Sequence, residues 1–144
     1  MKEKKANVLI LDDENEKLSL LAKLLNESGY TVHTTTSSSE AVNILKTECE
    51  KETPVEVLIL DIILEKERGE NTLKTGLEHY PHLQVITSNG HLSCRELAET
   101  IPLGAVHYFK EPPGTGEIIK SIDLAYEYYY KNTYCFPNFF GTPI

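Results

Sequence analysis

The chain has 144 residues, of which 40% are hydrophobic and 25% are charged, and its formal net charge is −8. This length suits one domain with a single core. The acidic balance argues against a nucleic-acid partner, because phosphate binding needs clustered Lys and Arg. The three cysteines, Cys49, Cys94 and Cys135, are too few and too widely spaced for a disulfide framework or a zinc motif. No run of about 18 apolar residues and no signal peptide is visible, so we expect a soluble cytoplasmic protein with no membrane partner.

Short strand-like runs alternate with amphipathic helical stretches along the chain, which predicts a parallel sheet with helices on both faces. The strands are predicted at residues 7–12, 31–35, 56–61, 83–88 and 105–109. The helices are predicted to lie before Gly29, after a capping box of Ser37 and Glu40, before Tyr80, over 93–101 and over 115–131. The fold class is therefore a single doubly wound α/β domain with five parallel strands and five helices.

Acidic residues close two of the apolar strands. Asp12 and Asp13 follow the run at 8–11, and Asp61 follows the run at 57–60. If these strands are neighbours, three carboxylates converge at the carboxyl edge of the sheet, where open α/β folds bind ligands. Carboxylates this close repel one another, so such a cluster indicates a site that binds a cation or takes part in a reaction. Mg²⁺ suits it, because this ion takes carboxylate oxygens. The alternative is that Asp13 or a neighbour merely caps the next helix.

The chain resembles the receiver domain of two-component response regulators over residues 7–131. The resemblance is carried by VLILDDE at 8–14, LILD at 58–61, Gly69, NGH at 89–91, GA at 104–105, Tyr108, and Glu111 with Pro112. It implies the flavodoxin-like strand order 2-1-3-4-5, a receiver domain over 1–131 and a separate tail over 132–144. It also implies a phosphorelay in which a histidine kinase or phosphotransfer protein donates a phosphoryl group.

The resemblance also assigns roles to individual residues. Asp61 is the phosphoacceptor, Asp13 a direct ligand of Mg²⁺ and Asp12 a ligand through water. Asp61 and the backbone carbonyl of Ile63 complete the metal ligands, and Tyr108 occupies the position of a switch aromatic. A carboxylate can carry a phosphoryl group as a mixed anhydride. Enzymatic activity would therefore be limited to self-catalysed phosphoryl transfer and dephosphorylation.

Two positions depart from the family pattern. Family members usually carry Thr or Ser after strand four and Lys after strand five, and both contact the phosphoryl oxygens. A gapless alignment puts Asn89 and Glu111 there, with Ser88 and Lys110 one residue earlier. Adjacent strand residues point to opposite faces, so Ser88 and Lys110 enter the site only through a register slip or a bulge. Two functions stay open: a phosphoaccepting receiver, and a degenerate receiver that docks proteins without phosphorylation.

Eight of the twelve aromatic residues lie in the last nineteen positions. Helical spacing explains Tyr126 and Tyr129, whereas Pro137 keeps the segment beyond Lys131 out of the helix. This tail either folds back over its own domain or docks a partner. Output is expected through a downstream protein target. A homodimer is expected through the face formed by residues 93–101, 105–109 and 115–131, or through the tail. The outer face of the charged stretch at 48–52 is expected to be solvated.

Overall fold

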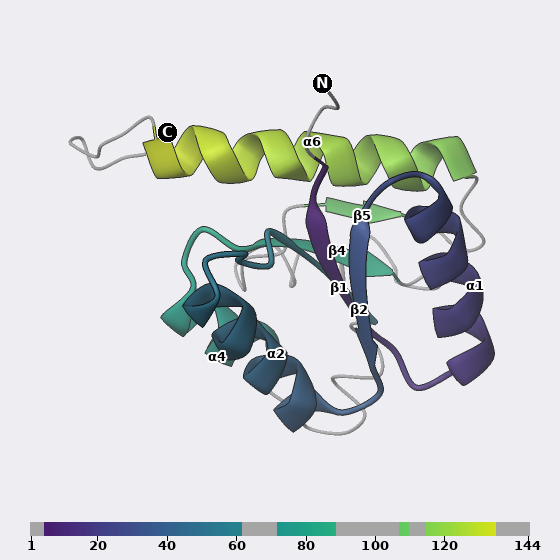
Figure 1. The fold of residues 1–144 in the computed structure, drawn as a ribbon, viewed down its shortest axis with the longest axis horizontal. Helices are drawn as coiled ribbons and strands as arrows, with labels where there is room; N and C mark the ends of the chain where they lie inside the picture. Colours follow the sequence, from purple (N-terminus) through teal and green to yellow (C-terminus); the bar gives the residue numbers. More distant parts are fainter. Residues whose placement is uncertain (1–4, 62–71, 89–106, 110–114, 135–144) are drawn as a thin grey trace, which may run out of the picture.

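The computed structural model describes residues 5–61, 72–88, 107–109 and 115–134 of the chain. Within these ranges the strands form one parallel sheet in the order β2-β1-β3-β4-β5 (Figure 1). They are β1 (Asn7–Leu11), β2 (Thr31–Thr35), β3 (Val57–Leu60), β4 (Gln84–Ser88) and β5 (His107–Phe109). The parallel sheet, with β1 between β2 and β3, confirms the predicted α/β fold with its parallel strands.

The described helices are α1 (Asn15–Glu27), α2 (Ser38–Glu50), α4 (Thr72–His79) and α6 (Thr115–Tyr134). The helix predicted over 93–101 lies outside the described residues, so the element count for the whole chain stays a prediction. None of the described helices is both long enough and apolar enough to cross a membrane. The predicted end of α6 at Lys131 is wrong, because the helix continues to Tyr134. Asn132 and Thr133 do not break a helix, and the first residue that does is Pro137.

Two apolar layers cover the sheet, one on each face. Val8, Ile10 and Ile59 pack with α1 and α6, whereas Leu9 and Leu58 pack with α2 and α4. Successive strand residues point to opposite faces, so each buried strand feeds both layers in turn. Figure 1 shows the same arrangement, with α1 and α6 on one side of the sheet and α2 with α4 on the other. Four positions of α6 are predicted to face the core: Ile118, Ile122 and Ala125 are buried, and Tyr129 is half-buried.

The predicted helix boundaries at Gly29 and Ser37 are confirmed. Gly29 has a φ of +97°, a left-handed conformation that glycine adopts at little cost, and it ends α1. The Ser37 side chain accepts the N–H of Glu40 at 3.2 Å and caps α2. The Glu40 carboxylate is bound by the Thr35 hydroxyl, and the Ser37 N–H donates to Thr35 Oγ1 at 3.0 Å. Thr35 thus ties the end of β2 to the start of α2.

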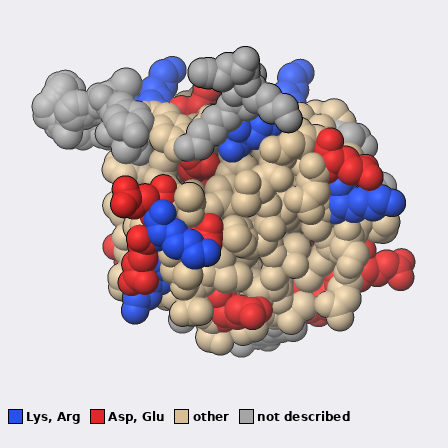
Figure 2. Space-filling view, in the orientation of Figure 1, with Lys and Arg blue, Asp and Glu red and all other residues tan. Residues whose placement is uncertain are grey.

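The edge strand β2 runs along the front of the molecule in Figure 1. Figure 2 shows the same face, with charged side chains around its margins and uncharged surface across its centre. The residues of β2 account for part of this pattern, since its sequence TVHTT contains no Asp, Glu, Lys or Arg. Charge is thus concentrated on the helices and the turns that surround this edge.

Candidate functional site

The carboxyl ends of β1 and β3 lie side by side, as the sequence predicts. Leu11 pairs with Leu60 at the end of the ladder, so the next residues, Asp12 and Asp61, are level with each other. The Asp61 N–H lies 3.4 Å from the Leu11 carbonyl oxygen. Strand alternation assigns both positions to the face of Ile10 and Ile59, which α1 and α6 cover. The two predicted acidic positions therefore meet at one edge of the sheet.

Asp12 is a buried carboxylate with two local partners. Only 4% of the residue is exposed. Its Oδ1 accepts the N–H of Glu14 at 3.1 Å, and its Oδ2 lies 3.1 Å from Lys17 Nζ. A buried carboxylate requires such a counter-charge, because desolvation penalises its ionised form. Lys17 is a site residue that the sequence analysis missed; its signal was a cation in the first helical turn after the acidic pair.

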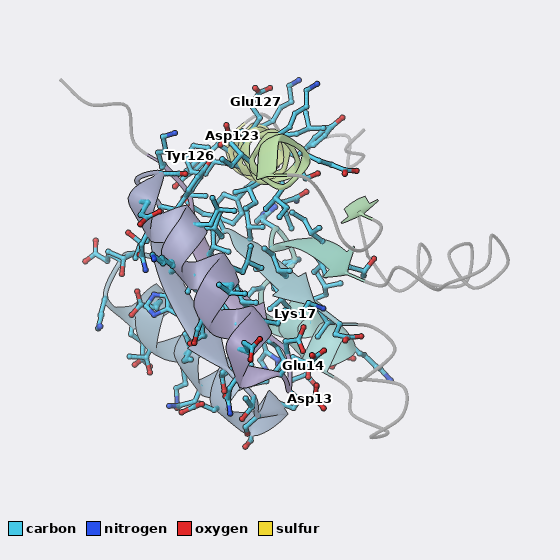
Figure 3. The ribbon with its side chains drawn as sticks, turned by 90° about the vertical axis from the view of Figure 1, so that its right-hand side faces the viewer. Asp13, Glu14, Lys17, Asp123, Tyr126 and Glu127 are labelled. Carbon is cyan, nitrogen blue, oxygen red and sulfur yellow. The ribbon has the colours of Figure 1, made fainter. Side chains whose placement is uncertain are left out.

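The side chains of Asp12, Asp13 and Glu14 form a compact acidic group. Each offers one carboxylate oxygen, and these oxygens lie within 4.8 Å of one another. Asp13 and Glu14 are exposed, and Figure 3 shows both beside Lys17 at the start of α1. Glu14 is the N-cap residue of α1 but makes no side-chain cap hydrogen bond. Capping therefore does not use its carboxylate, and the hard oxygen donors of this group fit Mg²⁺.

The remaining predicted site residues fall at the ends of β3, β4 and β5. Thr87 is fully buried and pairs with both Leu60 and Tyr108, so the position of Ser88 is level with that of Asp61. The backbone of Ser88 and Tyr108 is described, but their side chains are not. Ile63, Asn89, Lys110 and Glu111 lie outside the described residues. The roles that the resemblance assigns to these residues stay predictions. The role of Asp61 as a metal ligand is likewise still a prediction.

A second group of polar residues lies at the opposite, amino edge of the sheet, around the buried Asn7, Glu48 and Glu56. We call it the amino-edge cluster; its members are Asn7, His33, Glu48, Lys51, Thr53, Glu56 and Tyr130. Its members come from β1, β2, α2, the segment before β3, and α6. No local motif joins them, so the cluster could not be predicted from the sequence.

Glu48 is the most densely bonded member of the amino-edge cluster. Its Oε1 accepts from the Asn7 amide at 3.3 Å and from the Thr53 hydroxyl at 3.1 Å, and Lys51 Nζ lies 3.0 Å from its Oε2. His33 Nε2 is 3.3 Å from Oε1. Burial raises the pKa of the Glu48 carboxyl, but the bonds from Lys51, Asn7 and Thr53 outweigh it and hold the pKa below its usual range. Glu48 lies on the inner side of this stretch, because a helix turns its residues toward the core at intervals, whereas Glu50, Lys51 and Glu52 are exposed, as predicted for the outer face.

Glu56 joins the first strand to the last helix. Its carboxylate accepts the backbone N–H of Asn7 at 2.9 Å and the hydroxyl of Tyr130. Burial raises the pKa of Tyr130 above its ordinary value, and the hydrogen bond to the Glu56 carboxylate raises it further. Tyr130 is thus a neutral donor, and Glu56 a buried acceptor that fixes α6 against the sheet.

Comparison with known proteins gives the family. The model of the response regulator receiver domain matches residues 8–123. The chain therefore belongs to the response regulator receiver domain family. It is 29% identical over 123 residues to an NtrX-like response regulator of Rickettsia bellii, which covers 84% of this chain and 25% of that protein. The chain thus spans about a quarter of the length of this relative.

Two solved structures extend the comparison. The crystal structure of a receiver domain protein from Clostridium thermocellum has a TM-score of 0.71 and 25% identity, and the match covers 85% of this chain and 94% of that one. The solution structure of the beryllofluoride-activated NtrC4 receiver domain dimer has a TM-score of 0.71 and 26% identity, with 85% and 98% covered. The strand order and the acidic edge thus occur together in a chain of this family.

Proposed function

We propose that this receiver domain accepts a phosphoryl group on Asp61 and signals through protein contacts. The single observation that carries the proposal is the level position of Asp61 and Asp12 at the carboxyl edge, in a chain whose family is established. An Asp61 oxygen attacks the phosphorus of a phosphohistidine or of acetyl phosphate, and the bond from phosphorus to the donor breaks. The imidazole or acetate leaves with the electron pair, and Asp61 carries a mixed anhydride.

The acidic group supports a magnesium-dependent form of this chemistry. Asp12 and Asp13 would hold the ion, which supplies positive charge to the phosphoryl oxygens in a transfer that depends mainly on positioning and charge neutralisation. Ser88 is level with Asp61, and its hydroxyl is our first candidate for the contact with the phosphoryl group. The amide of Asn89 is the alternative. Glu111 occupies the position of the usual family lysine, and Lys110, one residue earlier, is the alternative contact of the phosphoryl group. Tyr108 occupies the position of the switch aromatic.

A donor kinase or phosphotransfer protein, a downstream protein target and a cytoplasmic location belong to the same proposal. The NtrC4 receiver domain, which is 26% identical to this chain, was solved as a beryllofluoride-activated dimer. The proposal therefore includes a homodimer of this chain, through the face expected from residues 93–101, β5 and α6 or through the tail at 132–144.

One observation favours a second candidate function, a protein-docking module that works without phosphate. Lys17 already supplies a positive charge to Asp12 at 3.1 Å, so this buried carboxylate is balanced without a metal ion. Such a domain keeps the receiver fold and the acidic edge but takes no phosphoryl group. The two functions differ in one covalent bond, which can be measured directly.

The test is intact-mass spectrometry after incubation with acetyl phosphate and Mg²⁺. We expect one phosphoryl adduct in the parent chain, none in Asp61→Asn, and an unchanged yield in Glu127→Gln, which removes an exposed carboxylate from α6. Ser88→Ala and Asn89→Ala, compared by adduct lifetime, identify the residue that contacts the phosphoryl group. A folded, magnesium-binding parent chain that yields no adduct would exclude phosphorylation by this donor and favour the docking module.

A further inference from the structure

The outer side of β2 is an open strand edge. β2 pairs with β1, and no other strand among the described residues pairs with it. Figure 1 shows β2 at the front of the molecule, with α1 to one side of it and α2 to the other. An open edge presents backbone N–H and C=O groups that can pair with a further strand. The outer side of β2 is therefore a surface to which a strand can add.

The hydrogen bonds between β2 and the first strand identify the backbone groups that point outward. The Thr31 N–H donates to the Ala6 carbonyl oxygen at 3.3 Å, and the Thr35 carbonyl oxygen accepts a backbone N–H from the same side at 3.2 Å. The peptide groups of every second residue in a strand face the same neighbour. The N–H and C=O groups of Val32 and Thr34 therefore point away from β1. The Thr34 side chain is also exposed.

β2 lacks the side-chain devices by which proteins usually protect such an edge. Its sequence TVHTT contains no proline and no charged residue, and its register with β1 is continuous, without a bulge. Proline, charged side chains and bulges are what normally prevent edge-to-edge pairing. Four of its five residues are β-branched, a type that favours strands. Both the backbone and the side chains of this edge thus suit pairing with another strand.

We propose that two copies of this chain pair antiparallel through β2, about a two-fold axis at His33. Val32 of one copy then lies opposite Thr34 of the other, and each turns its N–H and C=O toward the opposite residue. Each such pair exchanges two hydrogen bonds, and the two-fold symmetry repeats the pair. The two five-stranded sheets thereby form one continuous sheet.

The side chains and the charge distribution favour a second copy as the occupant of this edge. Pairing about His33 places Thr31 opposite Thr35 and Val32 opposite Thr34, and such threonine and β-branched pairs stabilise antiparallel strands. The net charge of −8 opposes self-association, but β2 contributes none of it. Figure 2 shows the charged side chains around the margins of this face, and physiological salt screens charges more than about 8 Å apart. Two acidic chains therefore meet the least repulsion at this edge.

Sedimentation velocity of the unphosphorylated full chain, at concentrations up to about 1 mM, measures this association. We expect Thr34→Pro to raise the dissociation constant of the dimer about thirtyfold, because the dimer loses two hydrogen bonds that contribute a factor of about five each. Proline suits this position, because the N–H that it removes points away from β1.

Two lysine variants provide a second test and a control. Thr34→Lys should also weaken the dimer, since it places a charge at the paired edge and keeps the backbone N–H. Leu124→Lys introduces the same charge at an exposed residue of α6 and should leave the dissociation constant unchanged. Circular dichroism checks that each variant is folded.

Three results would overturn the proposal. A parent chain that stays monomeric at every concentration would leave the edge to an extended segment of another protein. Folded Thr34→Pro and Thr34→Lys chains that dimerise as the parent does would place the interface on another surface. A dimer that Leu124→Lys dissociates, in place of the Thr34 variants, would assign the contact to the face of α6.

Discussion

The two edges of the sheet hold carboxylates in opposite environments. At the amino edge, Glu48 and Glu56 are buried, and each accepts hydrogen bonds from several parts of the chain. At the carboxyl edge, Asp13 and Glu14 are exposed and crowd together with Asp12. The same chemical group therefore serves two purposes. Buried carboxylates with matched donors stabilise the fold, whereas exposed and crowded ones stay open to solvent and, in our proposal, to a cation.

This contrast can be tested first at Glu56, where we expect the largest effect on stability. Glu56→Ala should lower the free energy of unfolding by about 3 kcal/mol, because the Asn7 N–H and the Tyr130 hydroxyl lose a buried acceptor. Urea denaturation followed by circular dichroism measures the change. Tyr130→Phe should cost about 1 kcal/mol, and the exposed Glu127→Ala less than about 0.5 kcal/mol. A Glu56→Ala chain as stable as Glu127→Ala would refute a structural role for this edge.

Glu48 should make the stability of the protein depend on pH through the same edge. Its folded pKa is lowered, so its contribution to stability is present above the ordinary Glu value of about 4.3 and is lost as pH falls through the lowered folded value. Glu48→Gln should cost about 2 kcal/mol at pH 7 and should weaken the loss of stability in acid. Unfolding curves between neutral and acidic pH measure both effects, with Glu50→Gln, an exposed residue of α2, as the control. Parallel pH curves for the parent and Glu48→Gln would contradict the assignment.

Lys17 tests the opposite edge. Without metal, Lys17→Met should lower the free energy of unfolding by about 1.5 kcal/mol, because the buried Asp12 carboxylate loses a cation. Mg²⁺ should stabilise this variant more than the parent, since the ammonium no longer competes with the ion for Asp12. Thermal unfolding with Mg²⁺ and with a chelator measures the difference, and Lys23→Met, exposed on α1, is the matched control. Equal stabilisation by Mg²⁺ in the parent and both variants would show that Lys17 does not compete with the ion for Asp12.

The smallest effect is expected at Ser37, where β2 meets α2 near the carboxyl edge. Ser37→Ala should lower the free energy of unfolding by about 1 kcal/mol, whereas Ser37→Gly should cost only a few tenths. The difference arises because glycine adopts the N-cap backbone easily and leaves the Glu40 N–H open to water. Urea unfolding of both variants tests this, and equal costs would assign the effect to side-chain packing instead of the cap.

Local sequence signals predicted most of the described elements. The apolar runs at 8–11 and 57–60 became the central strands, and Gly29 and Ser37 marked helix boundaries as expected. Such signals act over a few residues, so they are visible without the fold. The end of α6 was misplaced, because a proline shows where a helix cannot continue but not how far it extends before that point.

The sequence by itself determined the parallel sheet and the acidic carboxyl edge, because hydrophobic periodicity and the residues that close each strand are local properties. Only the tertiary structure decided how Asn7, Glu48, Glu56 and Tyr130 combine, since they come from distant parts of the chain. The same holds for a cavity between α2, α4 and α6. Lys17 became a partner of Asp12 because the folded chain places its ammonium 3.1 Å from the carboxylate. Hydrogen bonds and ion pairs depend on distances of a few ångströms, and only packing sets these distances.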